Sequence, residues 1–136
     1  MQVRHKGEGV KSMAARSFRP SRYEHWTEQA PEVYSFLEER FGSTPVLNEE
    51  GADLLLPDGT RVEVKAAKEW NKTAYSRGTR RRGRFQLHGY ECCDYFLFVL
   101  VRENGQLNLH LESYLSTIAR FGMECCINWK AIEQFN

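Results

Sequence analysis

An uninterrupted apolar run is the feature that most constrains the fold of this chain. From Asp94 to Val101 the sequence reads Asp-Tyr-Phe-Leu-Phe-Val-Leu-Val, with no charged residue after the aspartate. A short run rich in aromatic and β-branched residues predicts a strand that is buried on both faces. Such a strand needs a covering layer on either side. We therefore expect an α/β or α+β domain, with a central mixed sheet of about five strands flanked by helices.

The segments that precede the apolar run in the sequence predict a helix and a short strand. Proline suits the first position of a helix expected over Pro31–Phe41, and Gly42 follows as its terminator. Pro45–Leu47 predicts a short first strand. Residues 1–25 are rich in basic side chains with little periodicity, so we expect a basic N-terminal arm followed by a single domain over residues 26–136.

The segments that follow the apolar run in the sequence predict a further strand and two helices. Asn104-Gly105 predicts a turn into a half-buried edge strand at Leu107–Leu111. Ser113 is expected to cap a helix that ends before Gly122, and Asn128 to cap another that runs through Phe135. No apolar run approaches the length of a transmembrane span, and the N-terminus lacks a signal-peptide core. We expect a soluble, cytoplasmic protein with no membrane association.

A hairpin is expected between the first strand and the apolar run. Leu54–Leu56 and Arg61–Ala66 predict two strands, and Pro57-Asp58-Gly59-Thr60 predicts the turn between them. Proline favours the first central position of a type I turn, and glycine favours the left-handed position that follows. The combination predicts a three-residue loop with a bulge.

The loop length sets the register of this hairpin. A three-residue loop pairs Leu54 with Val62 and Asp53 with Glu63, and it places Lys65 on the same face as the two carboxylates. A two-residue Asp-Gly loop would slip the register by one and send Asp53 to the opposite face. Two adjacent carboxylates repel unless a cation lies between them, and hard oxygen ligands favour Mg²⁺ or Mn²⁺. The alternative interpretation is a surface ion cluster without catalytic function.

Asp53 followed by Glu63-Val64-Lys65 resembles the signature of the PD-(D/E)XK nuclease superfamily, which includes restriction endonucleases and Holliday-junction resolvases. The resemblance implies a restriction-endonuclease-like core and an endonuclease that hydrolyses phosphodiester bonds. It implies that Asp53 and Glu63 bind the divalent metal, with the Val64 carbonyl as a further ligand, and that Lys65 is catalytic.

The same resemblance suggests further site residues. Many members place a glutamate of the first helix near the metal, for which Glu32 is the better candidate and Glu28 the second. Gln86 and Tyr90 have the Q-x-x-x-Y spacing that follows the lysine in some branches, where the glutamine approaches the active site. We expect Gln86 and Tyr90 to share one face of a helical turn. His88 between them is a candidate for phosphate contact or proton transfer, although an incidental histidine is the alternative.

Basic side chains are concentrated immediately after the hairpin. Residues 61–84 carry nine basic and two acidic side chains, a local charge of +7, whereas the other residues sum to −6 and the whole chain to +1. Such a cluster is a candidate nucleic-acid surface, and a solvated loop without function is the alternative. The residues expected to contact phosphates are Lys68, Lys72, Arg77, Arg80, Arg81, Arg82 and Arg84.

The four cysteines occur as two adjacent pairs, Cys92-Cys93 and Cys125-Cys126. Adjacent cysteines lack the C-x-x-C spacing of common zinc sites, so buried free thiols are expected rather than a zinc or iron–sulfur site.

The sequence therefore predicts a Mg²⁺-dependent endonuclease acting on nucleic acid, most readily DNA. A homodimer is expected because cutting two strands requires two sites. Junction-resolving and restriction-type enzymes are not separated by these features. The alternatives are a catalytically inactive nucleic-acid-binding module of the same fold and an RNA-processing nuclease.

Overall fold

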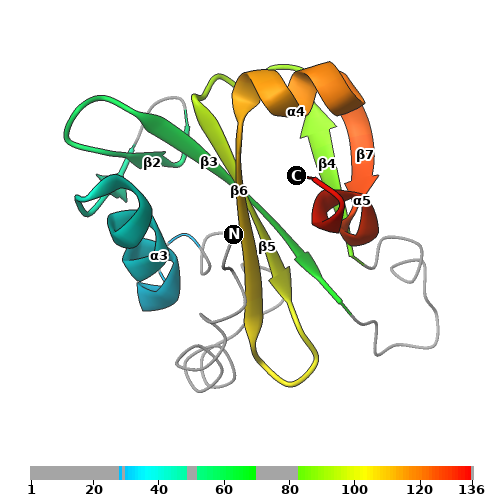
Figure 1. Ribbon diagram of the computed structural model, residues 1–136, viewed down its shortest axis with the longest axis horizontal. Helices are drawn as coiled ribbons and strands as arrows, with labels where there is room; N and C mark the ends of the chain where they lie inside the picture. The colour runs from blue at the N-terminus through cyan, green and yellow to red at the C-terminus, as the bar shows by residue number, and fades with distance from the viewer. Residues whose placement is uncertain (1–27, 29, 49–51, 70–82, 136) are drawn as a thin grey trace.

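The computed structural model of this chain describes residue 28 and residues 30–48, 52–69 and 83–135. These residues form a mixed α/β structure built on a five-stranded sheet (Figure 1). In spatial order its strands are β1 (Val46–Leu47), β2 (Leu54–Leu55), β3 (Arg61–Lys68), β5 (Tyr95–Val101) and β6 (Leu107–Ser113). Strands β3 and β5 are parallel and the other neighbours are antiparallel, so the sheet is mixed, as predicted. The expected N-terminal arm lies outside the described residues.

Strand β5 is buried on both faces, as its uninterrupted apolar sequence predicts. Leu97 and Val99 contribute to one hydrophobic core, whereas Phe96 and Phe98 contribute to the other, on the opposite face of the sheet. All four side chains are fully buried. The strand therefore lies in the middle layer of the molecule, between two covering layers.

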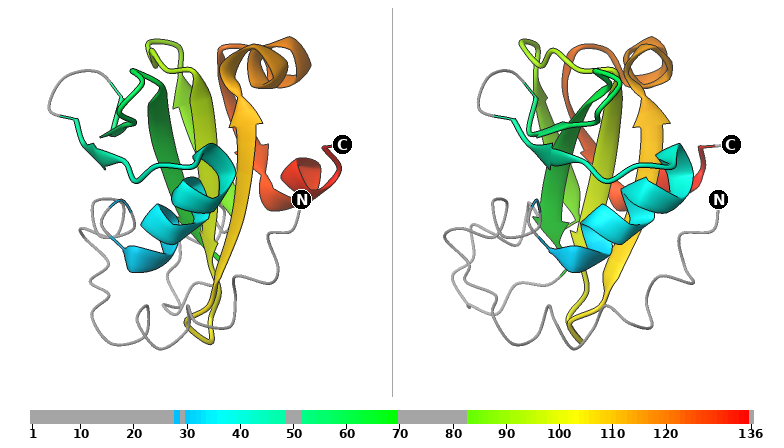
Figure 2. Two further views of the ribbon diagram at one scale, coloured as in Figure 1. Left: turned by 60° about the vertical axis from the view of Figure 1, so that its left-hand side comes forward. Right: turned by 90° about the vertical axis from the view of Figure 1, so that its left-hand side faces the viewer.

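Helix α3 (Pro31–Phe41) covers one face of the sheet (Figure 2). Its residues Val33, Phe36 and Leu37 are buried in the same core as Leu97 and Val99. The helix has the predicted bounds, and Gly42 ends it with φ 80° while its N–H donates to the carbonyl of Glu38.

The other face is covered by a second, two-stranded sheet together with two helices (Figures 1 and 2). The small sheet pairs β4 (Arg84–His88) with β7 (Glu124–Asn128) in antiparallel fashion. The helices are α4 (Tyr114–Phe121) and α5 (Trp129–Glu133). As predicted, the Ser113 hydroxyl and the Asn128 side-chain oxygen accept hydrogen bonds from the first turns of these helices. Helix α5 ends at Glu133, before the predicted Phe135, whose side chain is nevertheless buried.

The small sheet corrects one expectation and adds one strand that was not expected. The Gln86 region is a strand and not the predicted helical turn, because Phe85 and Leu87 alternate with polar residues and are buried in the core beneath the sheet. Strand β7 was not predicted. It forms because its backbone pairs with β4 and its Ile127 joins the same core, contacts that are distant in sequence.

Within the described residues, no helix is long and apolar enough to cross a membrane.

Candidate active site

The β2–β3 hairpin has the predicted three-residue loop. The N–H of Leu56 donates to the carbonyl of Thr60 at 2.9 Å, and the N–H of Gly59 donates to the carbonyl of Leu56 at 2.9 Å. Gly59 adopts φ 93°, a left-handed conformation that glycine tolerates without strain. Leu54 pairs with Val62, which confirms the predicted register.

This register buries one face of the hairpin and leaves the charged residues on the other. Leu54, Leu56, Val62 and Val64 are all buried in the core beneath helix α3. Because side chains alternate along a strand, Glu63 and Lys65 lie on the face that the small sheet partly covers.

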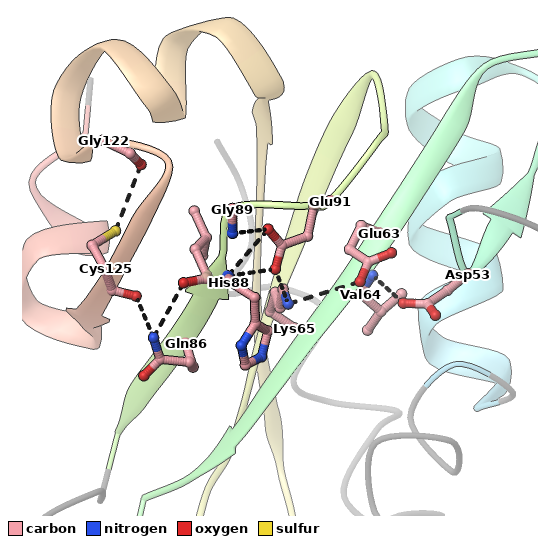
Figure 3. Close-up of polar contacts among 11 residues, drawn as sticks. Asp53, Glu63, Val64, Lys65, Gln86, His88, Gly89, Glu91, Gly122 and Cys125 are labelled. Atoms are coloured by element: carbon pink, nitrogen blue, oxygen red, sulfur yellow. Dashed lines mark hydrogen bonds and ion pairs between the residues drawn. The ribbon is translucent and has the colours of Figure 1, made fainter.

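Asp53 lies one residue before β2 and reaches across to β3. Its Oδ2 accepts a hydrogen bond of 2.8 Å from the N–H of Val64 (Figure 3). The side-chain amide of Asn48 donates to the carbonyl of Ala52, and the N–H of Asn48 donates to the carbonyl of Asp53, which anchors this segment. The carboxylate of Asp53 is therefore held beside Glu63, as the register predicts.

Glu63 is a partly buried carboxylate that lies close to other charged side chains. Its side chain is 18% exposed, and its Oε2 lies 3.8 Å from the Nζ of Lys65. Burial raises the pKa of Glu63 to about 7, and repulsion from Asp53 and Glu91 adds to the effect while Lys65 opposes it. The pair Asp53 and Glu63 thus concentrates negative charge in a site with limited access to water.

Glu91 joins this cluster and was not predicted from the sequence. Its side chain is 3% exposed, and its Oε2 lies 2.7 Å from the Nζ of Lys65 (Figure 3). The same carboxylate accepts hydrogen bonds from the N–H groups of His88 at 2.9 Å and Gly89 at 3.0 Å. Burial alone would favour the neutral acid, but the hydrogen bonds from Lys65 and His88 outweigh it, so the pKa of Glu91 is lowered.

Lys65 therefore lies between two carboxylates. It is closer to Glu91 than to Glu63, and its side chain is 13% exposed. Because its ammonium group is held by a buried acceptor, its position relative to Asp53 and Glu63 is fixed by the fold.

Gln86 lies on β4 beside β7. Its side-chain amide donates to the carbonyl oxygens of Leu87 and Cys125, each at 3.1 Å (Figure 3). His88 ends the same strand, and Tyr90 follows two residues later in the segment that carries Glu91. The predicted Q-x-x-x-Y residues thus lie on a strand and its following loop.

The candidate glutamates of the first helix are both buried. Glu32 is buried in the first turn of α3, which packs on the sheet face opposite to Glu63 and Lys65. Glu28 is also buried, and its charge contributes to a raised pKa of Tyr34. Their role as metal ligands stays a prediction.

Part of the predicted phosphate-binding segment is described. Lys72, Arg77 and Arg80–Arg82 lie outside the described residues. Lys68 ends β3, and the N–H of Gly83 donates to its carbonyl at 2.8 Å, so Lys68 and Gly83 lie side by side. Lys68 is three residues beyond Lys65, or about 10 Å along an extended strand.

The four cysteines are free thiols in different environments. Cys93 is buried as expected, and burial together with repulsion from Glu63 raises its pKa to about 12. Cys92 and Cys126 are exposed, which corrects the expectation of buried thiols, because neither is part of the hydrophobic core that includes Cys93.

The donor set determines what cation could bind. Among residues 28, 30–48, 52–69 and 83–135, no group of three histidine, cysteine, aspartate or glutamate side chains is placed to hold a metal ion. Asp53, Glu63 and the Val64 carbonyl offer only hard oxygen donors. That set suits Mg²⁺, which commonly binds one or two protein carboxylates and keeps several water or phosphate ligands.

No protein-family model matches this chain, and no curated protein sequence matches it.

Proposed function

We propose that this chain is a Mg²⁺-dependent phosphodiesterase that cleaves nucleic acid, with Asp53, Glu63 and Lys65 as its active-site residues. The observation that carries the proposal is the juxtaposition of two repelling carboxylates and an ammonium group on the β2–β3 hairpin. A purely structural cluster would balance its charges. Here burial, with added repulsion from Asp53, raises the pKa of Glu63 to about 7, and a bound cation would favour its charged form.

The roles of the side chains follow from their placement. Asp53, Glu63 and the Val64 carbonyl would hold the cation, which when bound polarises a phosphoryl oxygen and acidifies coordinated water. Lys65 supplies a fixed positive charge that can stabilise negative charge developing on the reacting phosphate. Glu91 holds that ammonium group in place through its 2.7 Å contact.

The fold supports the finer assignment to a restriction-endonuclease-like core. A helix precedes a mixed sheet, and the carboxylates lie on the antiparallel hairpin that leads into the central strands. This order agrees with what the sequence resemblance implies for the PD-(D/E)XK superfamily.

Nucleic acid is the substrate class that the charge distribution favours. The +7 segment over residues 61–84 includes Lys65 itself, and within it Gly83 lies next to Lys68. A polyanion that binds this segment would therefore pass close to the carboxylate cluster. DNA is the first candidate, and a homodimer would bring two such sites together for cleavage of both strands.

One observation favours the alternative of an inactive nucleic-acid-binding module. The Nζ of Lys65 lies closer to Glu91 than to Glu63, so part of its charge is neutralised by a residue outside the carboxylate pair. In that case the chain would bind nucleic acid through the basic segment without turnover.

Cleavage assays separate the two functions. Plasmid, branched, single-stranded DNA and RNA are incubated with the protein and Mg²⁺, Mn²⁺ or chelator, beside the isosteric variants Asp53→Asn, Glu63→Gln and Lys65→Met. We expect metal-dependent cleavage of at least one substrate and a loss of about 100-fold or more in each variant, because each removes a charge at the reacting centre.

Glu38→Gln is the matched control, since Glu38 is an exposed glutamate on α3. It should cleave like the parent protein. Absence of metal-dependent cleavage on every substrate, with binding retained, would establish the inactive module instead.

A further inference from the structure

Two aromatic rings stack on the surface beside the candidate active site. The rings of His88 and Tyr90 have centroids 5.2 Å apart and planes inclined by only 9°. Tyr90 is 76% exposed, although tyrosine usually buries much of its large ring in folded proteins. The pair therefore presents a flat aromatic surface to solvent.

This ring pair is fixed to the carboxylate cluster by Glu91. The Glu91 carboxylate that holds the ammonium of Lys65 also accepts hydrogen bonds from the N–H groups of His88 and Gly89 (Figure 3). Gly89 has φ 94°, a left-handed turn that places Tyr90 back over His88. One buried carboxylate thus sets the positions of both the lysine and the rings.

The chemistry of such a surface favours a planar aromatic partner. An exposed ring can stack on the face of any nucleobase, and this contact tolerates all base identities because every base has a π-face. In a regular duplex both faces of each base are already covered by neighbouring base pairs. A stacking surface is therefore available only to a base that is unpaired or displaced from its helix.

We propose that the His88–Tyr90 ring pair binds an unpaired nucleobase adjacent to the phosphate held at Asp53, Glu63 and Lys65. This inference rests on the proposed function and specifies its substrate class. The preferred substrate is single-stranded nucleic acid, or a duplex interrupted by an unpaired nucleotide, and the preference is for structure and not for sequence.

The test measures binding separately from cleavage. Glu63→Gln protein is mixed with oligonucleotides that carry the fluorescent base 2-aminopurine, as a single strand, as a perfect duplex and as a duplex with one unpaired 2-aminopurine. Fluorescence quenching reports stacking on a ring, and anisotropy of an end label reports affinity.

Tyr90→Ala is then added to the Glu63→Gln protein. We expect the affinity for the single strand and for the interrupted duplex to fall about tenfold or more, and the protein-induced quenching to disappear. Affinity for the perfect duplex should change less than about twofold, since its bases are not exposed for stacking. Tyr90→Phe keeps the ring and should behave like the Glu63→Gln parent.

Leu115→Ala is the matched surface control, because Leu115 is 77% exposed and carries no aromatic ring. It should leave all three affinities unchanged. Undiminished quenching in Tyr90→Ala, or an equal loss of affinity for all three oligonucleotides, would overturn the stacking site. Failure of the proposed function would appear separately, as absence of cleavage by the unsubstituted protein.

Discussion

At the scale of single residues, the proposed cation site depends on the electrostatics of Glu63. Burial and the nearby Asp53 both penalise the charged form of Glu63, and Lys65 compensates only in part. The folded protein therefore retains a proton on this group at pH values where the unfolded chain has released it. The pH dependence of stability and the binding of a cation should therefore both depend on Glu63.

The first prediction concerns the pH dependence of stability. The pKa of Glu63 is about 7 in the folded protein, compared with an ordinary value of 4.5. Between these values the folded state binds more protons, so the free energy of unfolding should fall as pH rises from about 4.5 to about 7. Thermal unfolding in chelator should show this fall, and the Glu63→Gln variant should lack this component of it.

Added Mg²⁺ provides the complementary measurement. At pH 8 it should raise the Tm of the parent protein more than that of Asp53→Asn or Glu63→Gln, because only the parent offers both carboxylates. Identical pH profiles and identical Mg²⁺ responses in the parent and the Glu63→Gln variant would refute the cation site.

Glu91 shows why one site residue could not be found from the sequence. Its role depends on a contact with Lys65, which is distant along the chain, and on backbone N–H groups that converge only because β4 ends in a left-handed turn. Nothing in the local pattern distinguishes Glu91 from a solvated loop glutamate. The sequence did predict Asp53, Glu63 and Lys65, because a local turn sets the register of the hairpin that carries them.

The second prediction concerns Glu91. Replacing it with glutamine removes the charged partner of Lys65 and weakens the bonds from His88 and Gly89. Glu91→Gln should lower the free energy of unfolding by about 1.5–3 kcal/mol in urea titrations, the usual range for hydrogen bonds to charged groups. It should also reduce kcat while leaving binding of the perfect duplex unchanged. A variant as stable and active as Glu38→Gln would contradict this role.

At the scale of elements, features that depend on nearby turn and cap residues could be predicted from the sequence. Strands that depend on contacts distant in sequence could not. The helix bounds at Pro31 and Phe41, the caps at Ser113 and Asn128, and the hairpin register all follow from turn and cap residues within a few positions. Strands β4 and β7 pair only with each other and depend on packing against the central strand.

The missed strand β4 did carry a local signal. Arg84 to His88 alternates polar and apolar residues, and its burial alternates in the same way. The spacing of Gln86 and Tyr90 favoured a helical turn in the sequence interpretation, and the alternation was the better guide. Strand β7 alternates weakly, because cysteines occupy two of its five positions.

The third prediction concerns the turn that sets the hairpin register. Gly59 has φ 93°, where a side chain is strained even though a Cβ would meet no atom within 4 Å. Gly59→Ala should therefore lower the free energy of unfolding by about 1–2 kcal/mol. Gly59→Asn should cost less, because asparagine tolerates the left-handed region better. Equal stability of Gly59→Ala and the parent in urea titrations would argue against the bulged loop.

At the scale of the whole molecule, a nearly neutral chain is strongly polarised in charge. The +7 of residues 61–84 is balanced by −6 over the rest, so the total of +1 conceals a basic region next to the carboxylate cluster. Within this region the N–H of Gly83 donates to the carbonyl of Lys68, so these two residues lie side by side. A nucleic acid should therefore be attracted to this region more strongly than to the other residues taken together, whose net charge is negative.

The fourth prediction follows from this polarity. Arg80, Arg81 and Arg82 are expected to neutralise phosphates, so the logarithm of the binding constant should fall linearly with the logarithm of salt concentration. Replacing all three with glutamine should weaken binding uniformly across base sequences and reduce the magnitude of that slope by roughly 2–3. Anisotropy titrations over a range of salt concentrations measure both effects.

A charge-matched control separates local contact from total charge. Replacing Arg40, Arg120 and Lys130 with glutamine removes the same three charges from outside residues 61–84. If local phosphate contacts dominate, this control keeps the parent slope, because counterion release depends on the phosphates that are contacted. If both triple variants lose the same affinity and slope, only the overall charge matters, and the assignment of the basic segment as the phosphate-binding surface is wrong.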